Sequence, residues 1–285
     1  MAFPIRQLQS SEFPSLLKEI PDTPKRLFVR GELPRADYTM LCVVGSRATT
    51  PYGRRMCQAL ISGLARSPVA IISAMALGID TEAHKTALDV GLPTVAVLPS
   101  SCDDKSLYPS SNKALAQRIL ARGGALLSEN VAPFKAMTHS FAQRNRIMSG
   151  MSKATLIIEA GEKSGTLITA RLALDYNREV LCVPHELGRE SGAGANRLIR
   201  EGATLVRSAE DILQALGLAS EPLQTTLPTD LSESESKILE VLTESLVKDE
   251  IIERSELDAQ EVSIVLTSLL IRGLINERLG KIERL

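Results

Sequence analysis

Glycine, serine and arginine follow an apolar run in the N-terminal part of the chain. The segment VVGSRATTPYG contains Gly45, Ser46 and Arg47. Glycine permits a tight turn, while hydroxyl groups, backbone N–H groups and a guanidinium are groups that hold phosphate oxygens. An ordinary strand-to-helix turn with a solvated arginine uses the same residues, so both interpretations stay open. The spacing is neither the GxGxxG of a dinucleotide site nor the Gly-Lys-Ser/Thr of a P-loop.

A second polar cluster lies within the segment SFAQRNRIMSGMS and consists of Phe141, Arg144, Asn145 and Arg146. An aromatic ring, two guanidinium groups and an amide suit phosphates and a stacked base. A solvated helical turn with the ring in the core has the same composition, and the local sequence does not decide between the two. Upstream of the ring, Lys135 is a candidate for a further phosphate contact.

The third candidate, EAGEKSGTLITARLA, is typical of a strand, a loop and the start of a helix. Backbone amides at that helix start, with the hydroxyl groups of Ser164 and Thr166 on either side of Gly165, can accept a phosphate aided by the helix dipole. A capped helix without a ligand uses the same residues. Three such loops at one edge of a sheet together favour an anionic, phosphate-bearing ligand.

Other reactive residues are too scattered to form a catalytic or metal site. His84, His139 and His185 have no partners at metal-ligand spacing, and the four cysteines lie far apart. The sequence contains no GxSxG motif. Asp80 and Glu82 open a helix, where acidic residues most often act as caps. We therefore expect no catalytic residue, no metal and no cofactor.

Short apolar runs alternate with helical patterns through the middle of the chain and must position these loops. The predicted strands cover residues 41–46, 69–74, 93–100, 125–130, 154–161, 179–185 and 203–208. Apolar strands separated by helices predict an α/β fold over residues 37–217, with an extended Rossmann-like, doubly wound and mostly parallel sheet. Ligands of such sheets bind where strands end and helices begin, which is where the candidate loops are expected.

The rest of the chain divides into three parts. Residues 1–36 form an N-terminal lead-in, and the aperiodic, proline-containing segment 218–231 is typical of a linker. Residues 232–285 contain three helical patterns and a terminal hairpin with a turn at Gly280. This pattern predicts a small winged helix-turn-helix domain, whose first helix starts with a capping box of Ser232 and Glu235.

Composition narrows the class of protein. Of the 285 residues, 44% are hydrophobic. No run reaches the ~18 apolar residues of a membrane span, and the N-terminus lacks the apolar stretch of a signal peptide, so we expect a cytoplasmic protein with reduced thiols. Aromatic residues make up only 3%, which excludes a surface of many stacked rings.

Charge is distributed unevenly along the chain, although the formal net charge is only −1. Residues 230–285 carry 7 Lys/Arg against 13 Asp/Glu, which leaves 26 against 21 for residues 1–229. A core of net charge +5 is therefore joined to a tail of −6. The core can attract a polyanion, while the acidic tail repels one.

The candidate loops belong to a longer series of segments. In unbroken order over about residues 10–215, the chain contains VVGSRATTPYG, ISAMALGIDTEAH, PTVAVLPS with YPSSN, LLSE, FAQRNRIMSGMSKATLIIEAGEKSGTLITARLAL, REVLCVP and ANRLIREGA. This series resembles the DNA-processing protein A family (DprA, also called Smf), and its long block from RNR to TAR is highly specific. The tail resembles the winged-helix domain that many members carry.

The resemblance implies a bacterial cytoplasmic protein, not an enzyme, that binds single-stranded DNA through its Rossmann-like domain. It also implies a homodimer that protects incoming strands during natural transformation and helps load the RecA recombinase onto them. The family's Gly-Ser-Arg motif corresponds to Gly45, Ser46 and Arg47, and its Phe-x-x-Arg-Asn-Arg motif corresponds to residues 141–146. Both motifs coincide with loops chosen above for their chemistry.

Three positions depart from the family pattern. Lys135 lies six residues before the aromatic residue, further away than the usual lysine. Leu77 stands where the family has the arginine of Ala-Arg-Gly-Ile-Asp, and His185 stands where it has the glycine of a Pro-Gly pair. The lost arginine implies weaker binding or a groove of different shape.

A competing function is that of a lysine-decarboxylase-like (LOG) nucleotide phosphoribohydrolase. These enzymes share the Rossmann variant and carry a catalytic carboxylate in a PGGxGTxxE-type loop. The corresponding stretch here has Ile168 and Thr169 where the glutamates belong, so the acid–base group for hydrolysis is missing.

The acidic tail also has two interpretations. A winged helix normally places a basic helix in the major groove, but the last helical pattern here begins with Asp258 and Glu261. We therefore expect the tail to contact protein, or its own core domain, rather than DNA.

Overall fold

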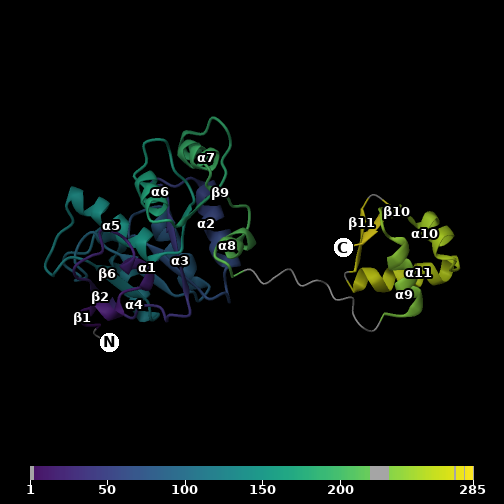
Figure 1. The fold of residues 1–285 in the computed structure, drawn as a ribbon, viewed down its shortest axis with the longest axis horizontal. Coiled ribbons are helices and arrows are strands. Elements are labelled where there is room, and N and C mark those ends of the chain that lie inside the picture. Colours follow the sequence, from purple (N-terminus) through teal and green to yellow (C-terminus); the bar gives the residue numbers. More distant parts are fainter. Residues whose placement is uncertain (1–2, 219–230, 273, 279, 285) are drawn as a thin grey trace. The chain divides into compact units, whose positions relative to one another are not determined.

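The computed structural model describes residues 3–218, 231–272, 274–278 and 280–284. The chain divides into two compact units, Met1–Ala219 and Ser220–Leu285 (Figure 1). Within the described residues, the first unit holds a nine-stranded sheet and the second a three-stranded sheet. Nearly all of the predicted linker lies outside the described residues.

The large sheet is mostly parallel. Its strands run in the order β1 (Ile5–Gln7), β2 (Phe28–Gly31), β6 (Ala125–Ser128), β5 (Thr94–Val97), β4 (Val69–Ser73), β3 (Thr39–Val44), β7 (Ala154–Ile157), β8 (Glu179–Cys182) and β9 (Thr204–Leu205). Strands β3 to β9 pair in parallel, whereas β1 and β2 extend one edge by antiparallel pairing. The predicted α/β fold is confirmed, and the predicted lead-in contributes two strands to it.

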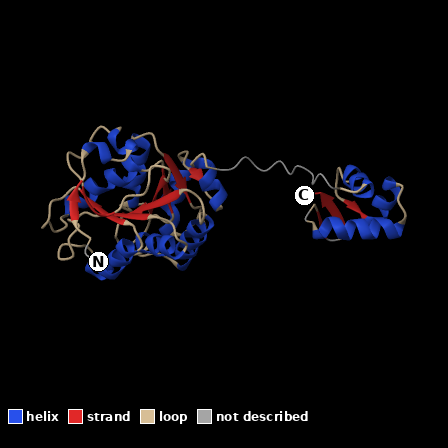
Figure 2. Cartoon of the chain, turned by 90° about the horizontal axis from the view of Figure 1, so that it is seen from below, coloured by secondary structure: helices blue, strands red, loops and turns tan. Residues whose placement is uncertain are grey.

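Helices cover both faces of this sheet (Figure 2). One face carries α1 (Ser15–Lys18), α5 (Thr138–Met151), α6 (Thr166–Asp175) and α7 (Ala193–Arg200), and the other carries α2 (Pro51–Gly63), α3 (Ile79–Asp89), α4 (Lys113–Ala121) and α8 (Ala209–Ala215). In β3, Cys42 and Val44 pack on the first face while Leu41 and Val43 pack on the second. Because both faces are buried from Leu41 onward, that part of the strand is apolar. Short 3-10 turns lie at Ser10–Glu12, Ser110–Asn112 and Glu190–Gly192.

The strand order reverses at β3. From β3 the chain proceeds through β4 and β5 to β6, and it then crosses by way of α5 to β7 on the opposite side of β3. The loops that leave β3 and β7 therefore diverge to opposite faces, and a crevice forms at the carboxyl ends of these two strands. Two of the three candidate loops begin there.

The second unit has the predicted winged-helix arrangement. It contains α9 (Glu233–Val241), β10 (Leu246–Val247), α10 (Lys248–Ser255), α11 (Ala259–Ile271), β11 (Ile275–Arg278) and β12 (Lys281–Arg284). The three strands are antiparallel in the order β10-β12-β11. The predicted capping box is confirmed, since Ser232 and Glu235 each accept a backbone N–H of the other. Among the described residues, every helix falls short of what crossing a membrane requires.

Candidate functional site

The three predicted loops meet in one pocket of about 610 Å³ at the carboxyl edge of the large sheet. Nine of the predicted site residues line it, namely Gly45, Ser46, Arg47, Phe141, Arg144, Asn145, Ser164, Gly165 and Thr166. They come from the loop after β3, from α5 and from the start of α6. Segments far apart in the sequence are thus brought together at the crevice where the strand order reverses.

The loop after β3 is clamped by its neighbours. The backbone N–H of Ser46 donates to the Glu159 carbonyl at 2.8 Å, and the N–H of Ile79 donates to the Ser46 carbonyl at 3.1 Å. A Cβ atom at Gly45 would lie 2.6 Å from the Ile79 side chain, and one at Gly78, where φ is +79°, would lie 2.2 Å from the Ser46 carbonyl oxygen. Only glycine permits this close approach.

The buried carboxylate of Glu159 holds the same loop through hydrogen bonds. Glu159 is fully buried, and its Oε2 accepts the backbone N–H of Thr50 at 3.0 Å and the hydroxyl of Thr49 at 3.1 Å. The Thr50 hydroxyl in turn accepts the N–H of Gly53 and caps α2. The loop that carries Arg47 is therefore held at both ends. Sequence reasoning missed this residue, whose signal is an acidic side chain within a predicted apolar strand.

Arg47 and Phe141 form the exposed wall of the pocket. Arg47 is exposed, and its guanidinium carbon lies 5.4 Å from the centroid of the Phe141 ring, within the range of a cation–π contact. The ring of Tyr108 meets Phe141 edge to face, with centroids 5.6 Å apart. Tyr108 was not predicted as a site residue, although it lies in the YPSSN segment that carries part of the family resemblance.

Arg144 provides a fixed charge in the wall of the pocket. Only 7% of the residue is exposed, and it donates to the Val97 carbonyl at 2.7 Å and to Asn145 Oδ1 at 3.1 Å. Burial lowers the pKa of Arg144 to about 10, so the guanidinium stays charged at neutral pH. The side chain cannot swing away from the pocket without losing these bonds.

Asp80 places one carboxylate against the two arginines. It lines the pocket from the first turn of α3, while Gly78 occupies the cap position. Burial raises the pKa of Asp80 to about 6, against the opposing effects of Arg144, the Ala76 backbone, Arg47 and Ser73. The carboxylate therefore changes charge near neutral pH, a property that the expectation of a helix-capping acid did not include.

The start of α6 forms the third wall. No side chain caps the helix at Gly165, and the N–H of Thr166 donates to the Ser164 hydroxyl at 3.2 Å. The positive end of the helix dipole thus lies at the pocket, where it favours an anion.

Two predicted site residues lie elsewhere. Arg146 donates to both carboxylate oxygens of Glu129, at 2.7 and 2.6 Å, and lies 3.5 Å from a carboxylate oxygen of Asp22. It follows Arg144 by two residues in α5, a spacing that turns the two side chains to different sides of a helix. Lys135 is exposed in the loop before α5 and does not line the pocket.

A larger hollow of about 1250 Å³ adjoins the pocket and shares Ser46 and Ser164 with it. Its lining carries four basic residues, Lys163, Arg189, Arg197 and Arg200, and two acidic residues, Glu162 and Glu190. Of its lining cations, Arg189 pairs with Glu186, and Arg197 pairs with Glu201 outside the hollow. The smaller pocket is the one in which the three predicted loops meet around the buried Arg144.

His84 and His185 make hydrogen bonds outside the pocket, whereas His139 is exposed. His84 is fully buried, with its ring nitrogens 2.7 Å from the Thr94 hydroxyl and 2.6 Å from the Ala74 carbonyl. His185 lies outside the pocket, with Nε2 2.9 Å from the Ile158 carbonyl. Throughout the described part of the chain, no three His, Cys, Asp or Glu side chains gather as metal ligands.

Comparison with known proteins agrees with this geometry. Residues 5–217 match the profile of the DNA recombination-mediator protein A family. The chain belongs to this family. Residues 221–281 match the DprA winged helix domain, so both units correspond to parts of DprA proteins. The resemblance inferred from the sequence is confirmed.

Two relatives illustrate the extent of the match. The chain is 41% identical to the protein Smf of Escherichia coli over 207 residues, which cover 73% of this chain and 55% of that protein. It is 36% identical to the DNA processing protein DprA of Streptococcus pneumoniae over 211 residues, which cover 74% of this chain and 73% of that protein. The chain thus spans about half the length of the Escherichia coli protein.

Solved DprA structures share the fold. The X-ray structure of DprA from Streptococcus pneumoniae superposes with a TM-score of 0.69 at 35% identity, covering 74% of each chain. The DprA of Helicobacter pylori gives a TM-score of 0.66 at 29% identity, covering 76% of this chain and 98% of that one. The Helicobacter pylori structure is described as giving insight into a single-stranded DNA binding mode.

Proposed function

We propose that this chain binds single-stranded DNA through the pocket between Arg47, Arg144 and the start of α6. The observation that carries the proposal is the convergence of three phosphate-binding features from distant segments in one pocket. One of them, Arg144, is a buried guanidinium held by hydrogen bonds. Membership of the family and the DNA-binding mode described for the Helicobacter pylori protein support the same function.

The geometry suggests how the strand is held. Arg47 is exposed and can follow a phosphate, whereas Arg144 contributes a charge of fixed position. The positive end of the α6 dipole at Gly165 also favours a phosphate. Since these contacts go to phosphates rather than to base edges, binding is sequence-independent and weakens with salt, with a slope of about −0.7 per phosphate contacted.

The wider role follows from family membership. We include in the proposal that the protein is a cytoplasmic homodimer, not an enzyme, and that it protects incoming strands and helps load RecA during natural transformation. The support for these partners is the match to DprA relatives over most of the chain. Accelerated assembly of RecA on a strand coated with single-strand-binding protein is the measurement that tests the loading role.

The DNA-binding proposal is tested by fluorescence anisotropy with single-stranded and duplex oligonucleotides of equal length. We expect tight, salt-sensitive binding of the single strand, weaker binding of the duplex, and a loss of affinity in Arg47→Ala of about tenfold. Arg122→Ala is the matched control, because Arg122 is an exposed arginine of the same unit outside the pocket. If Arg47→Ala and the wild type bound the single strand with equal affinity, the pocket would not be the DNA-binding site.

One observation favours a second candidate, the LOG-like phosphoribohydrolase. A buried carboxylate whose pKa lies near neutrality, such as Asp80, is what an acid–base catalyst needs. However, no other carboxylate among the described residues lines the pocket, and Asp80 interacts with Ser73 and the Ala76 backbone. Release of free base from nucleoside monophosphates, in proportion to the protein added and absent in Asp80→Asn, would favour the hydrolase instead.

A further inference from the structure

The larger hollow of about 1250 Å³ continues the carboxyl edge of the sheet beyond the phosphate-binding pocket. It lies between the loop after β7, the loop after β8 and helix α7. Because β3, β7 and β8 are neighbouring parallel strands, the loops that follow them lie at the same edge of the sheet. The pocket and the hollow share Ser46 and Ser164 as a common wall.

Two cations of this hollow are free to bind an anion. We call it the basic hollow because four basic residues line it against two acidic ones, namely Lys163, Arg189, Arg197 and Arg200 against Glu162 and Glu190. Lys163 and Arg200 are exposed, and among the described residues neither has an ion-pair partner. Arg189 pairs with Glu186, but the two side chains are 70% and 71% exposed, and a pair of this kind is weak. A phosphate can therefore replace its carboxylate.

Hydrogen bonds fix the walls of the basic hollow. The Ala160 carbonyl, in the loop after β7, accepts the N–H groups of Gly194 and Ala195 at 2.8 and 3.2 Å. In α7, Asn196 donates to the His185 carbonyl and accepts the His185 N–H, both at 2.9 Å. Helix α7 is thus tied to the loops after both strands. The arginines that it carries start from a fixed backbone, which lowers the entropy lost on binding.

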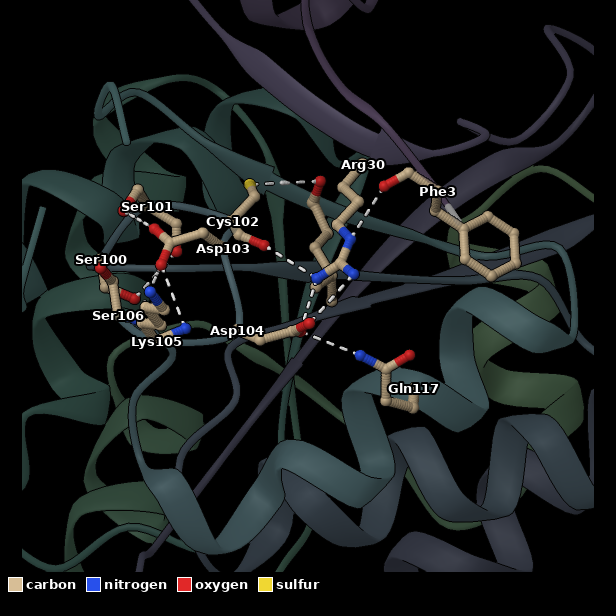
Figure 3. Close-up of polar contacts among 11 residues, drawn as sticks. Phe3, Arg30, Ser100, Ser101, Cys102, Asp103, Asp104, Lys105, Ser106 and Gln117 are labelled. Atoms are coloured by element: carbon tan, nitrogen blue, oxygen red, sulfur yellow. Dashed lines mark hydrogen bonds and ion pairs between the residues drawn. The ribbon is translucent and has the colours of Figure 1, made fainter. Parts of the chain in front are cut away.

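On the other side of β3, the same edge of the sheet presents acidic side chains (Figure 3). The loop after β5 carries Asp103 and Asp104. Asp104 accepts the guanidinium of Arg30 at 2.6 and 3.2 Å, so this cation is already paired. Asp103 accepts the backbone N–H groups of Lys105 and Ser106 at 3.1 and 2.9 Å. A polyanion that leaves the pocket is therefore attracted toward α7 rather than toward β5.

We propose that the basic hollow binds the phosphates of a single strand that continues beyond the phosphate-binding pocket, with Lys163 and Arg200 as the main contacts. The inference rests on the proposed binding of single-stranded DNA and extends it from one pocket to a track across three strands. Because a nucleic acid strand carries a charge at every nucleotide, the segment that passes Ser46 and Ser164 brings further phosphates to the free cations.

The basic hollow makes binding depend on the length of the strand. A strand of about four nucleotides occupies the pocket alone, whereas one of about 12 nucleotides also reaches α7, and both lengths lie in the range of known single-strand sites. Each phosphate that is neutralised adds about 0.7 to the salt slope. The longer strand should therefore bind more tightly and with the steeper slope.

The test compares oligodeoxythymidylates of about 4 and about 12 nucleotides by anisotropy with the full chain at several salt concentrations. In the double variant Lys163→Ala/Arg200→Ala, the salt slope for the longer strand should fall by about 1.4, because two phosphate contacts are lost. Its affinity for that strand at low salt should fall about tenfold. Its affinity for the shorter strand should stay within about twofold of the wild type.

The matched control is Lys113→Ala/Arg122→Ala, which removes the same charge from exposed positions of the same unit outside both cavities. It should bind both strands as the wild type does.

A further variant, Glu162→Gln/Glu190→Gln, removes the two carboxylates of the basic hollow. It should strengthen binding of the longer strand by a few fold, because less negative charge opposes the phosphates. Misfolding cannot produce such a gain, so this variant tests the inference even if the alanine variant is unstable. Unchanged affinity of this variant for the longer strand would contradict the inference.

The outcomes separate this inference from the proposed function. Equal weakening of both strands by Lys163→Ala/Arg200→Ala, or an unchanged salt slope for the longer strand, would overturn the basic hollow and leave the pocket intact. A loss of the same size in the control would assign the effect to the net charge of the unit and overturn the inference as well. Failure of the wild type to bind either strand would overturn the proposed function itself.

Discussion

The guanidinium of Arg47 rests against the ring of Phe141, with its central carbon 5.4 Å from the ring centroid. One residue follows β3 and the other lies in α5, so their contact joins two of the loops that the sequence singles out. An arginine that stacks on a ring is held in place yet keeps its N–H donors free at the edge. Arg47 is therefore oriented toward the pocket before any ligand binds.

This orientation predicts that lysine cannot fully replace Arg47. Arg47→Lys keeps the charge but loses the planar stacking on Phe141, so we expect an affinity for single strands between those of the wild type and Arg47→Ala. In a titration at several salt concentrations, Arg47→Ala should lower the salt slope by about 0.7 and Arg47→Lys should leave it unchanged. An unchanged slope in the alanine variant would mean that Arg47 contacts no phosphate.

DNA binding should strengthen as the pH falls. The pKa of Asp80 is raised by burial to about 6, so its carboxylate loses its charge between about pH 7.5 and about pH 5. That charge opposes a phosphate beside Arg144 and Arg47, and its loss should raise single-strand affinity several fold. Asp80→Asn should bind tightly at every pH, while Asp89→Asn, at the exposed end of α3, should behave as the wild type. A pH response that persists in Asp80→Asn would contradict this assignment.

The stability of the first unit should decline in mild acid because of His84. Burial lowers the pKa of His84 to about 4, so below pH ~6.5 the unfolded chain binds a proton that the folded chain excludes. The contribution of neutral His84 to the free energy of unfolding is complete above pH ~6.5. It is lost progressively toward pH ~4, and the total loss is up to about 3 kcal/mol. Urea unfolding at a series of pH values measures the decline.

The matched variant for that measurement is His84→Gln. It should be less stable at neutral pH but should lack the decline in acid. The pH dependence that remains in this variant should have the opposite sign and come from Asp80. Because the pKa of Asp80 is raised in the folded state, that state binds a proton more readily than the unfolded chain, and folding is favoured below pH ~6. A decline as steep as that of the wild type would show that His84 is not its source.

Arg146 should contribute to stability and not to DNA binding. Its partly buried, two-bond contact with Glu129 fixes the loop before α5, and loss of such a charged contact costs about 1–3 kcal/mol. We expect Arg146→Ala to lower the free energy of unfolding by this amount and to keep single-strand affinity within about twofold. Arg118→Ala, which breaks an exposed pair with Asp89, should change neither property. A reduced salt slope in Arg146→Ala would contradict this prediction, because it would show that Arg146 contacts a phosphate of the DNA.

The winged-helix unit should be dispensable for single-strand affinity. Its helix α11 begins with Asp258, which accepts the N–H groups of Gln260 and Glu261, and Arg272 near its end is paired with Glu235 at 2.9 Å. Such a helix offers little positive charge to phosphate. Removal of residues 230–285 should leave the affinity within a few fold, and a loss beyond about tenfold, or about 1.4 kcal/mol, would contradict this.

The alternation of apolar runs and helices was sufficient to predict the parallel sheet. Each of the strands β3 to β8 overlaps a predicted run, because a strand buried on both faces is largely apolar. The short strand β9 also lies within a predicted run, although both of its residues are exposed. Strands β1 and β2 were not predicted, since they are short and β2 pairs with the distant β6. No local pattern records such a partner.

The loops of the site were predictable because parallel strands end at one edge, but their side-chain directions were not. Arg144 and Arg146 are alike in the sequence, and only the packing of α5 turns one to the pocket and the other to Glu129. Tyr108 contacts Phe141 from a segment that was not selected for its chemistry. Both facts depend on how distant elements pack, which local chemistry does not encode.

The antiparallel pairing of β2 with β6 has a consequence for the chain as it is synthesised. Gly31 ends β2, and its partner Ala125 in β6 is made 94 residues later. At a translation rate of ~5–20 residues per second, β6 is synthesised roughly 5 to 20 s after β2. During that interval the edge of β2 that later pairs with β6 is open, and a chaperone that shields exposed strand edges would act there first.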